Sequence, residues 1–199
     1  MSEGGAPSAL PRFTAYIALG SNLGSNLGSN LGSNLGNSNS ENGPAQQIEH
    51  ALLELRTLPQ TVLVRHSGLY QSPPAGHADQ PDYVNAVAEL RTRLNPSALL
   101  HALLQMELRF GRHRLFRNAP RTLDLDLLLY EAQTLHDPGL TLPHPRMHTR
   151  PFVLVPLLEI APHIEIPGHG PIRSLHSAHD RSQLWPVETC RSALLAGAA

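Results

Sequence analysis

Two aspartates separated by one residue, Asp124 and Asp126, lie in the apolar segment LDLDLLLY. If this segment is a β-strand, alternate residues share a face, so the two carboxylates project together while Leu123, Leu125 and Leu127 point into the core. Paired carboxylates repel each other unless a cation lies between them, and hard oxygen ligands suit Mg²⁺, which also binds substrate phosphates. A strand edge with two solvated acids has the same pattern, so the pair alone is a weak indication of a metal site.

Basic residues cluster immediately before this acidic pair, in the segment RFGRHRLFRNAPRT. The cluster consists of Arg109, Arg112, His113, Arg114, Arg117 and Arg121. The formal net charge of the chain is -1, so the positive charge is local, and no global field attracts nucleic acid or an anionic membrane. Arginine side chains bind phosphate oxygens through paired hydrogen bonds. Cations beside a dicarboxylate metal site are the groups that phosphoryl transfer requires.

Other interpretations of these charges stay open at this stage. The basic segment is also typical of a solvated loop or of an RNA-binding face, although the latter predicts exposed aromatic side chains and the chain is only 5% aromatic. A Mg²⁺-dependent phosphohydrolase would use the same aspartates but admit water. The twelve histidines are scattered, with no H-E-x-x-H motif and no cysteine partners, so no zinc site is expected.

Hydrophobic patterning predicts the elements that position these residues. Short apolar runs predict strands at residues 13–19, 61–70, 83–92 and 123–130. Helices are expected to begin at Pro44 and at Asn95-Pro96, and a shorter one, interrupted by Pro156, over residues 150–161. The order β-α-β-β-α-β is the split βαβ arrangement, an α+β fold in which helices pack on one face of an antiparallel sheet.

Composition limits the organisation of the chain. A length of 199 residues suits one domain of ordinary size, expected over residues 13–181 after a disordered N-terminus at 1–12, with a C-terminal tail from 182 to 199. Cys190 is the single cysteine and forms no internal bridge, which suits a reducing compartment. The apolar runs are too short for a transmembrane helix and no signal peptide is evident, so a cytoplasmic location is expected.

The motif SNLG occurs four times in succession between Ser21 and Gly36. The first copy follows the first strand directly, whereas the next helix begins only at Pro44, so a repeat-expanded flexible loop is expected at about residues 20–43. Covalent attachment to the strand fixes where the backbone of the first copy lies. We therefore expect the first copy to be the one that acts, and the other three to be tolerated.

The segment APRTLDLDLLLY resembles the P-R-T-L-D-[LI]-D signature of the 6-hydroxymethyl-7,8-dihydropterin pyrophosphokinase family. Three further segments agree in order and spacing: AYIALGSNLG, SGLYQSPPAGHADQPDYVNAVAEL and LPHPRMHTRPFVLVPLLEIAP. The resemblance covers residues 13–167 and implies a ferredoxin-like fold, a monomer, and a role in folate biosynthesis. It also implies the reaction: in-line transfer of pyrophosphate from ATP to the hydroxymethyl group of the pterin, with release of AMP.

The resemblance implies roles for residues on the nucleotide side. Asp124 and Asp126 match the pair that holds two Mg²⁺ ions against the ATP phosphates, and Arg112 and Arg121 match catalytic-loop arginines. Further positions that match ATP-binding residues are Glu107, Arg114, Thr141, His144 and Arg150. The arginine loop is one residue shorter than the family pattern, and it carries Asn118 and Ala119 where many members have tryptophan and glycine. Pro145 stands where some members have a tyrosine.

The resemblance also implies a pterin site. Asn85 matches the side chain that reads the hydrogen-bonding edge of the ring, and Phe152 matches the aromatic that stacks on it. Other matching positions are Ser72, Pro73, Ala75 and Tyr83. A flat polar heterocycle needs such an aromatic face and a few fixed donors and acceptors. Each residue has a structural alternative, since Phe152 also suits a core position and Asn85 a loop edge.

Deletion of residues 25–36, the three additional SNLG copies, is expected to leave the fold and the turnover nearly intact. Each doubling of a flexible loop changes the free energy of closure by only about 0.6 kcal/mol. Thermal unfolding and steady-state turnover of the deletion variant check this expectation. A large loss of activity would show that the additional copies act.

Overall fold

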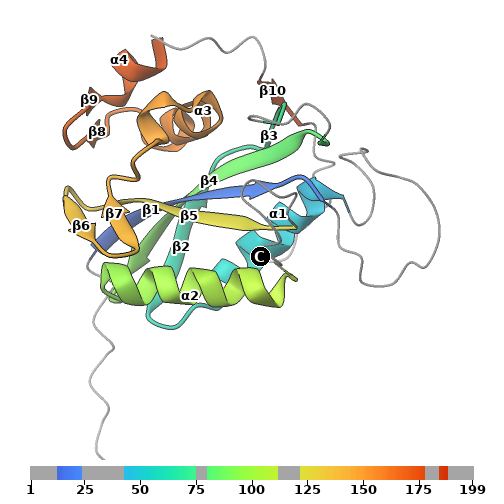
Figure 1. Cartoon of the computed structure of the whole chain (residues 1–199), viewed down its shortest axis with the longest axis horizontal. Helices are drawn as coiled ribbons and strands as arrows, with labels where there is room; N and C mark the ends of the chain where they lie inside the picture. The colour runs from blue at the N-terminus through green and yellow to red at the C-terminus, as the bar shows by residue number, and fades with distance from the viewer. Residues whose placement is uncertain (1–12, 24–42, 75–79, 112–121, 178–183, 188–199) are drawn as a thin grey trace, which may run out of the picture.

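The computed structural model describes residues 13–23, 43–74, 80–111, 122–177 and 184–187. The main elements are β1 (Phe13–Ser21), α1 (Pro44–Leu55), β2 (Thr61–His66), β3 (Tyr70–Ser72), β4 (Tyr83–Thr92), α2 (Pro96–Arg109), β5 (Asp124–Tyr130) and α3 (Pro151–Ile160). The smaller ones are β6 (Leu135–Asp137), β7 (Leu140–Leu142), a 3₁₀ turn at Met147–Thr149, β8 (Glu165–Ile166), β9 (Gly170–Pro171), α4 (Ile172–Ser177) and β10 (Trp185–Pro186). Figure 1 shows α1 and α2 on one side of the main sheet and α3 with α4 on the other.

The main sheet has six strands within the described residues, in the order β10-β3-β4-β1-β5, and β2 also pairs with β4. All of its pairings are antiparallel. With β2 and β3 lying one after the other along the same edge of β4, this is the split βαβ arrangement, and the expected α+β fold is confirmed. The strand expected over residues 61–70 is divided: β2 ends at His66 and β3 begins at Tyr70. The register of β2 with β4 also shifts, between Leu63 and Arg65.

The larger core lies between the sheet and the helices α1 and α2. Along β1, Ala15, Ile17 and Leu19 are buried on this side, against Ile48 of α1 and Leu103 of α2. Both helices begin as their sequences predict, with a proline in the first turn, and the Asn95 side chain caps α2 by accepting a hydrogen bond from the Ala98 N–H.

A second core lies on the opposite face of the sheet, under α3, so the expectation that the helices pack on one face holds for α1 and α2 but not for α3 (Figure 1). Val153, Leu154 and Leu157 of α3 pack with Val87 of β4 and Leu128 of β5. The interruption expected at Pro156 does not occur: α3 is continuous from Pro151 to Ile160, since the buried residues around the proline hold the helix in place. No helix in these described ranges is both long and apolar enough to cross a membrane.

The tail from residue 182, to which we assigned no role from the sequence, contributes a strand. Trp185 pairs with Gln71 and Pro186 with Tyr70, so β10 extends the sheet beside β3. The Val187 N–H donates to the Leu69 carbonyl at 2.9 Å. A two-residue strand carries no recognisable alternation, so the sequence did not indicate this pairing.

The substitution Leu103→Ala is expected to lower the free energy of unfolding by roughly 2–5 kcal/mol, because this fully buried leucine would leave a cavity between α2 and the sheet. The matched control is Leu108→Ala in the same helix, where the side chain is 60% exposed and the expected change is within about 0.5 kcal/mol. Urea denaturation of both variants measures the difference. Equal losses would contradict the placement of the core.

Candidate active site

Residues of three neighbouring strands form a row across the α3 face of the sheet. Gly20 of β1 lies opposite Asn85 of β4 on one side and opposite Asp124 of β5 on the other. The adjacent row on the same face contains Val87, Ala18 and Asp126. Directly opposed residues in a sheet point to the same side. Asn85 and the acidic pair are therefore separated only by the two small residues Gly20 and Ala18.

Gly20 keeps the space above the middle of this row open. A Cβ atom at this position would meet Asn85 Oδ1 at 3.7 Å, an ordinary contact distance, so the backbone itself would accept a small side chain. A larger side chain would occupy the space between Asn85 and Asp124. Gly20, which directly precedes the first SNLG copy, thus forms part of the floor of the site.

Asp124 and Asp126 lie on the same face of β5, as the alternation of the sequence predicts, while Leu125 and Leu127 are buried on the other face. Two basic groups approach Asp126 Oδ2: His144 Nε2 at 3.8 Å and Arg150 Nη1 at 3.7 Å. Both distances exceed a hydrogen bond, and about a third of the Asp126 side chain is exposed to solvent. The exposed part of the carboxylate is thus accessible to a ligand from solvent.

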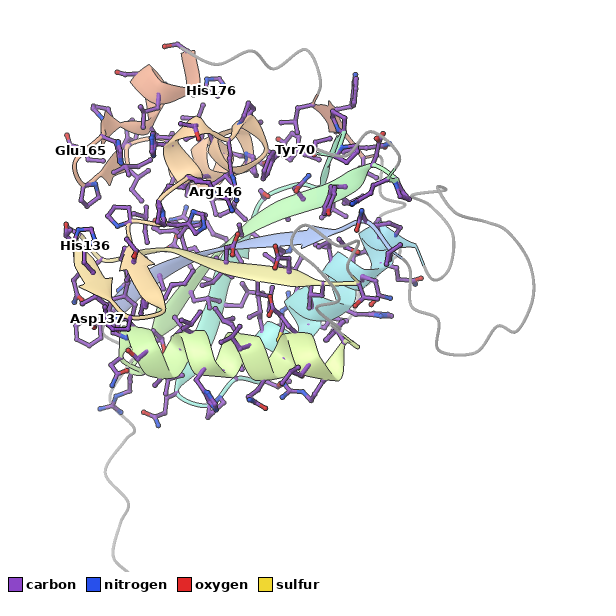
Figure 2. All side chains as sticks on the ribbon, viewed as in Figure 1. Tyr70, His136, Asp137, Arg146, Glu165 and His176 are labelled. Carbon is purple, nitrogen blue, oxygen red and sulfur yellow. The ribbon has the colours of Figure 1, made fainter. Side chains whose placement is uncertain are left out.

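His144 is held in a defined orientation. Its backbone N–H donates to the Leu128 carbonyl of β5 at 2.8 Å, and its Nδ1 accepts a hydrogen bond from the Arg146 N–H at 3.2 Å. Burial lowers the pKa of His144, the nearby Asp126 opposes this effect, and Arg150 and Arg146 add to it. Because Nδ1 is an acceptor, the neutral ring carries its proton on Nε2, the atom that faces Asp126. Figure 2 shows Arg146 on the α3 side of the sheet.

Arg150 links the acidic pair to the aromatic side of the site. It lies at the N-terminal end of α3, and its guanidinium carbon is 5.4 Å from the centre of the Phe152 ring. At this distance a cation is attracted to the face of an aromatic ring. Phe152 is half-buried at the edge of the second core, so the start of α3 carries both a cation next to Asp126, at the N-cap, and an aromatic ring.

Asn85 presents an acceptor to this face. The side chain is 5% exposed, and its Nδ2 donates to the Tyr70 carbonyl at 3.2 Å and to Ser72 Oγ at 3.0 Å. Both amide hydrogens are engaged within the protein, so Oδ1, on the Gly20 side, is the atom left to meet a ligand. The structure thus commits both donors of the Asn85 amide to β3.

The segment between β3 and β4 is tied to the first SNLG copy. Asn22, which is 2% exposed, donates from Nδ2 to Gln80 Oε1 at 3.2 Å and to the Pro81 carbonyl at 3.4 Å. The Tyr83 hydroxyl donates to the same Gln80 oxygen at 3.4 Å. Sequence reasoning did not single out Asn22, although its place in the strand-proximal copy was the available signal.

Glu107 lies on the other side of the sheet, in α2, and Thr141 lies in the β6–β7 hairpin. Glu107 of α2 is almost fully buried and accepts a hydrogen bond from the Leu125 N–H at 2.6 Å, so it holds the β5 backbone between the two aspartates. Thr141 is half-buried in β7, where it pairs with His136. Pro73 directly follows β3 and is half-buried. The remaining expected site residues lie outside the described residues: Ala75, Arg112, Arg114 and Arg121.

The donor set of the site suits magnesium. Within the described residues, no group of three or more histidine, cysteine, aspartate or glutamate side chains is placed to hold a metal ion. Zinc sites need three or four such ligands. Two carboxylates on one strand face match Mg²⁺, which keeps several waters and takes other oxygens from substrate phosphates. Asp124 and Asp126 therefore fit this ion.

Comparisons with known proteins point to one family. The family model described as 7,8-dihydro-6-hydroxymethylpterin-pyrophosphokinase (HPPK) matches residues 16–162. The 2-amino-4-hydroxy-6-hydroxymethyldihydropteridine pyrophosphokinase of Haemophilus influenzae is 45% identical over 162 residues, which cover 81% of this chain and 90% of the relative. The enzyme of the same name from Pseudomonas aeruginosa is 46% identical over 152 residues, covering 76% of this chain and 83% of the relative.

A solved structure shares the fold. The crystal structure of an HPPK-DHPS protein in complex with substrates superposes with a TM-score of 0.64 at 12% sequence identity, over 88% of this chain. The match spans about half of that longer chain, 48%. At this identity the likeness concerns the fold alone.

Proposed function

Since the chain belongs to the 7,8-dihydro-6-hydroxymethylpterin-pyrophosphokinase family, we propose how its own residues carry out the family's reaction. The enzyme transfers pyrophosphate from ATP to 6-hydroxymethyl-7,8-dihydropterin in folate biosynthesis, giving the pterin diphosphate and AMP. The observation that carries the proposal is the row Asn85–Gly20–Asp124, which joins a ring-reading amide to a metal-binding acid across one small residue. The monomeric state and the cytoplasmic location expected from the sequence stay predictions.

Asp124 and Asp126 would hold Mg²⁺, with two ions expected from the family resemblance. When bound, Mg²⁺ neutralises phosphate charge and increases the acidity of a coordinated hydroxyl group. The His144 ring and the Arg150 guanidinium flank Asp126 Oδ2 from the α3 side, at 3.8 and 3.7 Å. These two groups also lie where they would meet the nucleotide phosphates, and Arg112 and Arg121 would add charge from the segment outside the described residues.

The pterin would lie above Gly20, between the Asn85 amide and the Phe152 ring. Asn85 Oδ1 would accept a hydrogen bond from a ring N–H, while Phe152 and Tyr83 supply apolar faces for the heterocycle. Ser72 orients the Asn85 amide through its hydroxyl and, with Pro73, provides nearby backbone groups. In this position the hydroxymethyl group of the pterin would point over Gly20 toward Asp124 and Asp126.

In the transfer step, the hydroxymethyl oxygen forms a bond to the β-phosphorus of ATP as its proton is released. The bond from that phosphorus to the oxygen shared with the α-phosphorus breaks, and AMP leaves with this oxygen. The protein contributes chiefly by positioning the two substrates and by stabilising the charge that develops on the transferred group. No described side chain is needed as a general base.

The substitution Asp126→Asn is expected to lower kcat/KM by at least about a hundredfold, because it removes a charge that would hold the metal against the phosphates. AMP formation with ATP, Mg²⁺ and hydroxymethyl-dihydropterin measures the effect. The matched control is Asp137→Asn on β6, an exposed acid that Figure 2 labels on the hairpin, where activity is expected to stay within twofold. AMP formation by the native enzyme without the pterin would instead favour a phosphohydrolase.

The substitution Asn85→Ala is expected to raise the KM for the pterin roughly 10–100-fold with little change in the KM for ATP, because it removes the buried acceptor that reads the ring. Asn95→Ala, which removes the cap of α2, should cost about 1 kcal/mol of stability without changing either KM. Steady-state kinetics with each substrate varied in turn separates the two effects. An unchanged pterin KM in the Asn85 variant would place the pterin elsewhere.

A further inference from the structure

Glu159, near the end of α3, ties this helix to the strand that carries the Asn85 contacts. Its Oε1 and Oε2 accept from the Gly68 N–H at 3.0 and 3.1 Å, and Oε2 also accepts from the Tyr70 hydroxyl at 2.9 Å. Gly68 lies just before β3, and Tyr70 is its first residue. Figure 2 shows Tyr70 next to α3. These bonds join segments about ninety residues apart in sequence.

The same helix face carries the aromatic ring of the proposed pterin site. Phe152 and Glu159 are seven positions apart, so at 3.6 residues per turn they lie on one side of α3, about two turns from each other. Pro156 lies between them and lacks the N–H that would donate to the Phe152 carbonyl. The helix, although continuous, therefore lacks one of the backbone hydrogen bonds that would link its two ends.

The chain of contacts continues from Tyr70 to the ring-reading amide. The Tyr70 side chain meets Glu159, while the Tyr70 carbonyl accepts from Asn85 Nδ2. Burial, followed by the hydrogen bond to Glu159, raises the pKa of the Tyr70 hydroxyl to about 12, so this group remains a donor over the physiological range. Tyr70 thus links α3, the helix that carries Phe152, to the Asn85 amide.

We propose that Glu159 is a positioning residue for the pterin: by joining α3 to β3, it sets the separation between the Phe152 ring and the Asn85 amide. The inference rests on the proposed pterin site. Glu159 itself is exposed and makes its bonds at the side of the helix, so it would act through Tyr70, Gly68 and the helix rather than by contact with substrate. A small displacement of groups that orient a substrate has a large effect on turnover.

The substitution Glu159→Ala is expected to raise the KM for the pterin about tenfold while the KM for ATP stays within twofold, because charge-assisted hydrogen bonds that fix β3 to α3 are lost. Glu159→Gln should restore most of the affinity, since an amide oxygen accepts from Gly68 and the amide nitrogen meets the Tyr70 hydroxyl. Tyr70→Phe removes one of the two anchors and should give an intermediate KM.

Two controls make the result specific. Glu165→Ala removes an exposed glutamate of β8 (Figure 2) and should leave both KM values unchanged. Thermal unfolding, followed by circular dichroism, shows whether each variant is folded at the assay temperature. A Glu159→Ala enzyme that is folded and has a native pterin KM would overturn the proposal, as would an equal rise of both KM values.

The Asn85→Ala variant separates the two levels of inference. If it weakens pterin binding in isothermal titration calorimetry while Glu159→Ala does not, the pterin site stands and the positioning role of Glu159 fails. If neither variant weakens binding, the proposed pterin site is wrong, and the role of Glu159 fails with it. If both weaken binding and Glu159→Gln restores it, the positioning role is supported.

Discussion

The pairing of β1 with β4 on one side and β5 on the other is the constraint on which the rest of the site depends. Because side chains alternate along a strand, a shift of one residue would move every site residue to the opposite face. Burial of Ile17 and Leu19 against α1 and α2 prevents such a shift, since it would expose them to the solvent side. Burial of apolar side chains on one face thus determines which polar residues lie together on the other. Asn85, Gly20 and Asp124 form one row because only this register keeps the apolar residues in the core.

The two faces of the sheet therefore differ in composition and in cover. The α1 and α2 face is apolar and continuous, whereas the α3 face is covered only in part, by a helix whose N-cap is Arg150 and whose first turn carries Phe152. Next to the area of β1 that α3 covers, the small residues Ala18 and Gly20 leave room for a ligand. The negative charge of Asp126 is balanced by Arg150 at the start of this helix, and the His144 ring approaches the same carboxylate oxygen.

Much of this could be predicted from the sequence where the information is local. The common face of Asp124 and Asp126 follows from strand alternation, and the starts of α1 and α2 follow from their prolines and from Asn95. The resemblance to a family brought together residues far apart in the chain. The features that the sequence did not predict depend on contacts between distant segments. They are the division of β2 from β3, the packing of α3 on the second face, and the hydrogen bonds of Asn22 and Glu159. Neither propensity nor spacing encodes such contacts, because their partners lie tens of residues away.

The pairing of β10 with β3 also gives the protein a built-in optical probe. The chain contains one tryptophan, Trp185, and it lies opposite Gln71, one residue from the tyrosine that contacts both Asn85 and Glu159. About half of its surface is exposed, so its indole ring is in contact with water as well as with the sheet edge. Tryptophan emission from this enzyme therefore comes from a single place, the outer edge of the strand that supports the Asn85 amide.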